Sequence, residues 1–273
     1  MSNSPFGQGP SSHKELHLFV FEGRTAEPLY VKKFEKSFMG ERISVKTVFE
    51  GEIYQLYEQM KNENFALDIV NLLKERSEKN AQLLDGFNRD SFAYIYLFFD
   101  YDAHATSADD HKLSEMLAFF DNETENGMLY ISYPMVEAIR HYKDMKSFKQ
   151  LTVKCKRNNC PYKDGCEDFE ICMKEPHYKT FVSTDCRKQL TNINSYTREI
   201  WQELVLAHVS KMNYLVNDKY ELPDRIESQE VIFSNQLKKH IQHKCPMVAV
   251  LSAFPIYALD YFGPDKLKEK LEK

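Results

Sequence analysis

Short apolar segments alternate with amphipathic segments over the first half of this chain. Residues 16–21 (LHLFVF) and 92–99 (FAYIYLFF) are nearly unbroken apolar runs, and residues 127–132 (GMLYIS) form a third. Runs of this length without helical spacing are typical of buried strands. Residues 43–49 (ISVKTVF) alternate apolar and polar side chains and predict a half-buried strand. Strands separated by helices build βαβ units, so the sequence predicts an α/β fold with a mainly parallel sheet flanked by helices.

Helical patterns fill the segments between and after these strands. Thr25 is the expected N-cap of the first helix, and Pro28 lies in its first turn. The predicted helices cover residues 25–38, 52–60, 66–76, 113–120, 134–141, 192–220 and 248–262.

Composition divides the chain into four parts. Residues 1–14 are rich in Ser, Gly and Pro and predict a flexible leader, and residues 15–143 carry the α/β pattern of a catalytic domain. Residues 144–190 contain four cysteines within eighteen residues, many lysines and few aliphatic side chains, which predicts a Cys-rich, basic inserted module. Residues 191–273 predict a mainly helical C-terminal region that packs on the core. A chain of 273 residues can bury a large core without disulfides.

The ends and the charge of the chain suggest where it works. Residues 1–14 have neither the basic nor the apolar region of a signal peptide, and no apolar run reaches the length of a transmembrane helix. We therefore expect a cytoplasmic protein without a membrane partner. The net charge of −5 argues against a protein that coats nucleic acid through bulk charge, although a local basic patch is compatible with it.

Acidic residues follow three of the predicted strands. Glu22 follows the first strand directly, and Glu137 lies a few residues beyond the third. Asp100 and Asp102 follow the strand at 92–99 and, two residues apart on an extended chain, can face one ion. Because ligands bind at the carboxyl ends of strands in open α/β sheets, these carboxylates predict a Mg²⁺ site that polarises a phosphodiester. The alternative is that each acid caps the helix or turn behind it.

A second group of potential metal ligands lies in the predicted inserted module. Four thiolates in a short polar loop suit tetrahedral zinc, which can organise a segment that lacks its own core. The four are Cys155, Cys160, Cys166 and Cys172, with His177 as a possible substitute and with Cys186 and Cys245 farther along the chain. Their spacing differs from the CxxC pairs of common zinc ribbons. An iron–sulfur cluster, or unligated thiols in a loop, are the alternatives.

A basic stretch precedes and overlaps the cysteines. From Arg140 to residue 157 the chain carries seven Lys or Arg residues against one acid, Asp144. Beside a metal site, such a stretch can hold a phosphate backbone. A solvated surface is the alternative.

The order of the acidic motifs resembles a known family. A hydrophobic strand followed by EG (Glu22, Gly23), and then a hydrophobic strand followed by DxD (Asp100, Asp102), is similar to the two-part signature of the Toprim domain. More narrowly, FVFEGRTAEPLYVKKF, YLFFDYDAH and ISYPMVEAIRHY resemble the small Toprim proteins of bacterial anti-phage systems. These are the RloB-like proteins, the AriB effector of PARIS and, more distantly, the nuclease half of OLD proteins. The resemblance covers roughly residues 15–143.

The resemblance implies roles for individual residues. Glu22 would act as general base or metal ligand, Asp100 and Asp102 as Mg²⁺ or Mn²⁺ ligands, and Glu137 as an accessory acid. Toprim proteins often carry a late Lys near the scissile phosphate, which no motif identifies in this sequence. Arg24 and Arg140 are the candidate phosphate-binding residues in its place, and His104 is a candidate proton shuttle.

These motifs lead to one expected function and its alternatives. The resemblance implies a metal-dependent endonuclease effector of anti-phage defence that cleaves RNA, including tRNA, or DNA. It further implies an ABC-type ATPase partner that restrains the enzyme, and an active homodimer. One alternative is a non-catalytic, Toprim-like binding module whose acidic pocket is degenerate. Another is a different Toprim chemistry, that of a primase or a topoisomerase.

Overall fold

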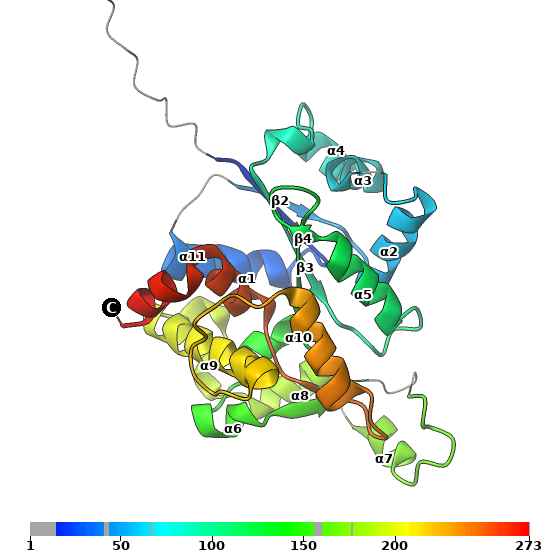
Figure 1. Ribbon diagram of the computed structural model, residues 1–273, viewed down its shortest axis with the longest axis vertical. Coiled ribbons are helices and arrows are strands. Elements are labelled where there is room, and N and C mark those ends of the chain that lie inside the picture. The colour runs from blue at the N-terminus through cyan, green and yellow to red at the C-terminus, as the bar shows by residue number, and fades with distance from the viewer. Residues whose placement is uncertain (1–14, 41–43, 67, 156–159, 176, 273) are drawn as a thin grey trace, which may run out of the picture.

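Figure 1 shows the computed structural model of the chain. It describes residues 15–40, 44–66, 68–155, 160–175 and 177–272. The leader predicted at 1–14 lies outside these residues. In the part of the chain that is described, no helix is both long and apolar enough to cross a membrane.

The main sheet has five strands in the order β2-β1-β3-β5-β4. β1 (His17–Phe21) lies between β2 (Ser44–Val48) and β3 (Tyr94–Asp100), and β3 pairs with β5 (Gly127–Ser132). These three pairings are parallel, whereas the two-residue strand β4 (Asp121–Asn122) is antiparallel to β5. The prediction of an α/β fold with a mainly parallel sheet is confirmed, and the three most apolar strands are neighbours.

Helices cover both faces of this sheet (Figure 1). The connections from β2 to β3 and from β3 to β5 lie on one face, where they form α2 (Ile53–Asn62), α3 (Ile69–Arg76), α4 (Glu78–Leu83) and α5 (Asp110–Phe119). On the other face lie α1 (Ala26–Phe34) with the π-helical turn Glu35–Met39, α9 (Arg198–Asn217) and α11 (Ala253–Glu272). The remaining helices are α6 (Met145–Lys149), α7 (Phe169–Lys174), α8 (Tyr178–Asp185), α10 (Gln229–Gln236) with the π-helical turn Leu237–Ile241, and the 3₁₀ turns Arg89–Ser91, Val136–Arg140, Lys188–Leu190 and Ile193–Ser195.

Aromatic side chains fill the space between the sheet and α11. The ring of Phe98 lies 5.2 Å from that of Phe254 and 5.5 Å from that of Tyr257. Trp201 on α9 is fully buried and packs 4.9 Å from the ring of Phe34 on α1. Large aromatic side chains bury much apolar area each, so these contacts hold the C-terminal helices on the sheet.

A second, two-stranded sheet joins the predicted module to the C-terminal region. β6 (Thr152–Lys154) pairs antiparallel with β7 (Met247–Ala249). Just beyond β7, Leu251 exchanges two backbone hydrogen bonds with Tyr133, at 2.8 and 3.0 Å. The small sheet is therefore continuous with the end of β5, and it lies at the carboxyl edge of the main sheet.

Three predicted helices differ in the structure. Residues 134–141 form the short 3₁₀ turn Val136–Arg140 instead of an α-helix, because the Pro134 carbonyl accepts the Asp102 N–H and Val136 to Ile139 are all buried. The stretch 248–262 begins as strand β7, since its β-branched residues pair with β6, and becomes helical only from Ala253. In addition, the long helix predicted at 192–220 begins at Arg198, after two 3₁₀ turns.

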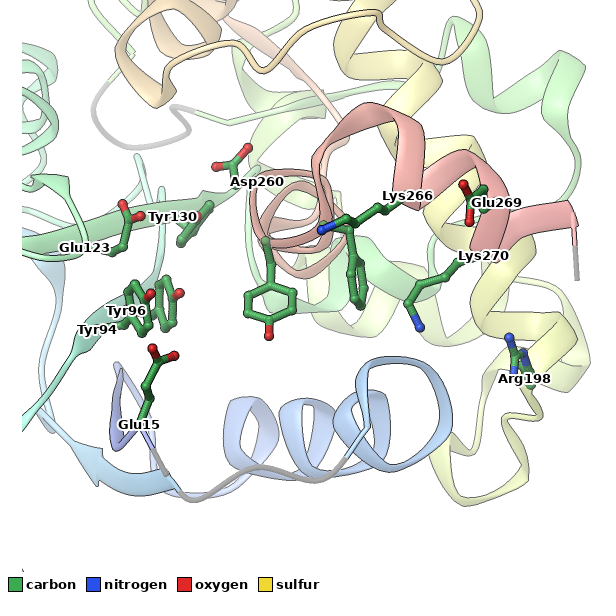
Figure 2. A pocket seen from close by; sticks show the side chains of 12 residues that line it. Glu15, Tyr94, Tyr96, Glu123, Tyr130, Arg198, Asp260, Lys266, Glu269 and Lys270 are labelled. Atoms are coloured by element: carbon green, nitrogen blue, oxygen red, sulfur yellow. The ribbon is translucent and has the colours of Figure 1, made fainter. Parts of the chain in front are cut away.

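A cavity of about 690 Å³ opens at the amino end of the strands. Figure 2 shows Asp260 of α11 in this cavity, beside Tyr130 of β5. Burial raises the pKa of the Asp260 carboxyl to about 7, and the charge of Glu123 also raises it, while hydrogen bonding to Tyr130 lowers it. In an unfolded chain an Asp ionises near pH 4. The native protein therefore holds a proton here that the unfolded chain releases between about pH 4 and pH 7.

This difference makes the free energy of unfolding fall as pH rises through that window. Asp260→Asn removes the buried acid, so we expect the variant to lose less stability than the wild type between pH 5 and pH 8. At pH 8 it should be the more stable protein. Thermal unfolding across this pH range measures the effect, with the exposed Asp121→Asn as control. Parallel pH profiles for Asp260→Asn and the wild type would contradict the assignment.

Candidate active site

The turn after β1 places Glu22 against the end of the neighbouring strand β3. The Glu22 N–H donates to the carbonyl of Phe98 at 3.1 Å, which continues the pairing of β1 with β3. The side chain then crosses to β3, where its Oε2 accepts the Asp100 N–H at 2.8 Å. The prediction that Glu22 and Asp100 come together at one sheet edge therefore agrees with the geometry.

The ladder between β3 and β5 continues past the ends of both strands. The Tyr101 N–H donates to the Ser132 carbonyl at 3.0 Å, and the Asp102 N–H donates to the Pro134 carbonyl at 3.2 Å. Asp102 has a φ of 42°, a left-handed conformation that Asp tolerates better than most residues. Asp100 is 5% exposed, and Asp102 lies beside it at the mouth of the site, with Oδ1 3.3 Å from His104 Nδ1.

Glu137 comes to the same edge from the 3₁₀ turn Val136–Arg140. Its side chain is buried, and its Oε1 lies 3.5 Å from the ammonium nitrogen of Lys179 on α8. Its Oε2 has no hydrogen-bond partner. Lys179 itself is largely exposed, so a cation from the predicted module lies at the open side of the acidic cluster.

Two further carboxylates join the cluster. Glu27, in the first turn of α1, is 6% exposed and packs over Gly23, where a Cβ would come within 3.2 Å of its Oε2. Glu52, at the start of α2, accepts a hydrogen bond from the Ser107 hydroxyl at 2.7 Å. We define the acidic cluster as Glu22, Glu27, Glu52, Asp100, Asp102 and Glu137.

Burial and mutual repulsion perturb this cluster. Burial raises the pKa of Glu22 well above its ordinary value, and the charges of Asp102, Glu27 and Glu52 raise it further, against the lowering effect of the Asp100 N–H. The pKa of Asp100 is also raised well above its ordinary value, first by burial and then by Glu22 and Glu27. Burial likewise raises the pKa of Asp102 and of Glu27. Like charges crowded in this way disfavour ionisation unless a cation neutralises them.

The donor chemistry of the cluster fits a hard divalent cation such as Mg²⁺ or Mn²⁺. Asp102 Oδ1 and Glu137 Oε2 are buried without accepting a hydrogen bond, and a cation would supply the missing partner. Nowhere in the described residues, however, do three or more His, Cys, Asp or Glu side chains already stand in a metal-binding arrangement. Ion binding therefore requires the side chains of Glu22, Asp100 and Asp102 to turn toward a common point.

The two arginines predicted to bind phosphate are engaged by other groups. Arg24 is exposed and forms an ion pair with Glu50, which lies just beyond β2. The Arg140 guanidinium donates to the Ser183 hydroxyl at 3.2 Å, toward α8. An exposed ion pair contributes little to stability, so Arg24 can exchange Glu50 for a phosphate at small cost.

A cavity of about 570 Å³ lies beside the acidic cluster. His104 and Lys179 line it on the side of the cluster, and Tyr178 and Phe181 of α8 provide aromatic walls. Lys154 of β6 lines it as well. The cavity thus combines aromatic surface with cationic side chains next to the carboxylates.

Several cations of the basic stretch are paired with acidic or aromatic side chains from other parts of the chain. Lys143 forms an ion pair with Asp185 at 2.6 Å, and Lys154 forms one with Glu175 at 2.9 Å. The ammonium group of Lys149 lies over the ring of Tyr214. Residues 156–159 of the stretch lie outside the described residues.

The predicted zinc ligands do not share one environment. Cys155 is 4% exposed within the hydrophobic core, next to β6. Cys160, Cys166 and Cys172 are half-buried in the segment that follows. His177 lines the 570 Å³ cavity.

No protein-family model, curated protein or solved structure matches this chain. The Toprim resemblance therefore stays a hypothesis that rests on the short motifs around Glu22, Asp100 and Glu137.

Sequence reasoning missed three residues of the site. Glu52 follows β2, so the rule that acids after strands meet at one edge could have identified it. Glu27 lies in the first turn of α1, where an acid is common because it interacts favourably with the helix dipole, so nothing in the sequence marked it as part of the site. Lys179 had no signal, because only the packing of α8 on the turn Val136–Arg140 brings it to Glu137.

Neutralising one buried carboxylate should relieve repulsion in the metal-free protein. In EDTA, we expect Glu22→Gln and Asp100→Asn to be at least as stable as the wild type, with a gain of up to about 1 kcal/mol, or roughly 2–4 °C in Tm. Adding Mg²⁺ should raise the Tm of the wild type and not that of Asp100→Asn. Thermal unfolding with and without Mg²⁺ measures both effects.

The exposed Glu125→Gln, at the opposite end of β5, is the matched control and should behave as the wild type. A Tm several degrees below wild type for both site variants in EDTA would show that these carboxylates are structural.

Proposed function

We propose that this protein is a Mg²⁺-dependent phosphodiester hydrolase of the Toprim type that cleaves nucleic acid. The observation that carries the proposal is the acidic cluster, which gathers carboxylates from the ends of β1 and β3 and from the turn after β5; Asp100 and Glu137 are buried and Glu22 is half-buried. The motifs around Glu22, Asp100 and Glu137 support the same assignment through their resemblance to Toprim nucleases.

Glu22, Asp100 and Asp102 are the residues that would hold the ion. A bound Mg²⁺ or Mn²⁺ polarises a phosphodiester and lowers the pKa of a bound water. Glu137 completes the negative wall opposite Lys179 and acts as an accessory acid.

Groups at the open side of the cluster would bind and orient the substrate. His104, 3.3 Å from Asp102, is placed to pass a proton between the site and solvent. Lys179 offers its charge to a phosphate oxygen, which would compete with Glu137 for the same ammonium group. The aromatic side chains of Tyr178 and Phe181 in the neighbouring cavity can stack against a base of the strand being cut.

The biological setting of this proposal rests on the resemblance alone. Small anti-phage Toprim effectors suggest a cytoplasmic endonuclease that an ABC-type ATPase partner restrains and that acts as a released homodimer. RNA, including tRNA, and DNA are all substrates that a phosphodiesterase site of this kind can accept.

The proposal predicts nuclease activity that depends on the divalent ion. Purified protein should cut at least one of plasmid DNA, total RNA or tRNA in Mg²⁺ and none in EDTA. Glu22→Gln and Asp100→Asn should lose about 100-fold or more of the activity while remaining folded. Glu125→Gln should keep wild-type activity. If the wild type stays inactive on all three substrates in Mg²⁺ and in Mn²⁺, the binding-module alternative becomes the better account.

Lys179 should matter for the same activity. We expect Lys179→Met to lose about 10- to 100-fold in kcat/KM, the range for one charge-assisted hydrogen bond to the substrate, and Lys179→Arg to recover part of it. Lys188→Met, an exposed lysine just beyond α8, is the control. Mg²⁺-induced stabilisation should be unchanged in Lys179→Met. Full activity of this variant would exclude Lys179 from phosphate binding.

A further inference from the structure

The segment 160–175 contributes no buried side chain to the protein. Its apolar residues Tyr162 and Ile171 are 42% and 61% exposed. A segment held by the hydrophobic effect would turn such side chains inward, so another interaction must fix this one.

The side chains that do turn away from solvent in this segment are mostly cysteines. Besides Phe169, the half-buried positions are Cys160, Cys166 and Cys172, and the other residues of the segment are exposed. The three cysteines recur at every sixth position. Because the thiols are half-buried while Tyr162 and Ile171 are exposed, we infer that interactions of the cysteine sulfurs determine the conformation of this segment.

Local backbone turns support this arrangement. The Lys163 N–H donates to the Cys160 carbonyl at 3.2 Å, and the Cys166 N–H donates to the Lys163 carbonyl at 3.3 Å. The next turn follows at once, since the Phe169 N–H donates to the Cys166 carbonyl at 3.2 Å. These turns fold the chain back on itself and keep Cys160 and Cys166 on one coiled stretch that leads into α7, where Cys172 lies.

A fourth thiol approaches from the C-terminal region. The β6–β7 ladder pairs Lys154 with Met247, and the next hydrogen bond runs from the Cys155 N–H to the Pro246 carbonyl at 3.3 Å. Cys245 therefore lies beside the point where the chain leaves β6 for the cysteine segment. The Cys245 side chain is exposed.

The far end of the segment returns to the same place. Lys154 Nζ lies 2.9 Å from Glu175 Oε1, just after α7. Because Lys154 pairs with Met247 of β7, this ion pair brings the end of the segment, just after Cys172, to the β6–β7 ladder. The segment therefore ends close to the loop that carries Cys245.

Cys155 lies deeper in the protein than these thiols. It is 4% exposed in the hydrophobic core and lines the 570 Å³ cavity, whereas the three cysteines of the segment are half-buried. Its place as a zinc ligand, which the clustered spacing predicts, therefore passes to Cys245.

We propose that Cys160, Cys166, Cys172 and Cys245 form a tetrahedral zinc-thiolate site that fastens the segment 160–175 to the β6–β7 ladder. The four thiols do not yet stand in ligand positions, and the lack of buried side chains leaves the segment able to close on the ion. On binding, each thiol loses its proton and each sulfur forms one bond to zinc, so four neutral thiols release four protons and no oxidant is needed. The site is independent of the phosphodiesterase proposal.

Zinc content of purified variants tests this ligand set. The wild type, loaded with ZnCl₂ and dialysed under reducing conditions, should hold about one zinc per chain. Cys245→Ser and Cys166→Ser should bind little or none, while remaining folded by circular dichroism. Elemental analysis and release of zinc by a thiol reagent provide two measurements.

Three variants outside the proposed set are the matched controls. Cys155→Ala, Cys186→Ser and His177→Ala should all keep the full zinc content. If Cys155→Ala loses zinc and Cys245→Ser keeps it, the ligand set proposed here is wrong. A wild type that binds no zinc, that carries iron with visible absorbance, or that forms disulfides among these cysteines in place of metal binding would overturn the site.

Discussion

Repulsion among carboxylates at the carboxyl edge of the sheet is the constraint on which the rest of this structure depends. The parallel pairing of β1 with β3 and of β3 with β5 brings the strand ends together, so the backbone positions of their acids are fixed close to one another. Burial removes the water that would screen them, and it is the largest cause of the raised pKa values of Glu22 and Asp100. A buried group of like charges destabilises a protein on its own. A divalent cation would reverse the sign of that interaction, which supports the proposal of an ion site at this edge.

Packing and hydrogen bonds on several sides of the carboxyl edge of the main sheet stabilise it against this repulsion. The aromatic packing of Phe98 against Phe254 and Tyr257 fixes the strand that carries Asp100. Beyond the strands, the hydrogen bonds of Asp102 to Pro134 and of Tyr133 to Leu251 prolong the backbone ladder into the site. The carboxylates therefore sit on rigid elements, and their side chains are the parts that move when an ion binds.

The acidic half of the site was predictable from sequence because it follows from strand order. Continuous apolar runs identify the buried strands in the sequence. Because parallel strands end at the same edge of a sheet, the acids that follow them lie together, and Glu22 and Asp100 meet there. The helix expected at 134–141 failed because the Pro134 carbonyl is used by Asp102, a tertiary contact that local pattern does not contain. The helix expected at 248–262 failed at its start for the same reason, since β7 forms only because β6 is available to pair with it. Lys179 and Cys245 lie beyond local prediction altogether, because each reaches its neighbours through segments distant in sequence.

The two halves of the site consequently depend on different parts of the chain. The carboxylates lie at the ends of strands of the main sheet and in the adjoining turns, so their positions do not depend on the segment 160–175. Lys179, by contrast, lies on α8, four residues beyond Glu175, whose contact with Lys154 ties this part of the chain to β6. A segment without buried side chains supports that contact only if something else orders it, and thiolate ligation to zinc is the interaction that its cysteines can make. Zinc at this position would therefore act on the side of the site proposed to bind substrate, while the Mg²⁺ affinity proposed for the carboxylates would follow from the sheet alone.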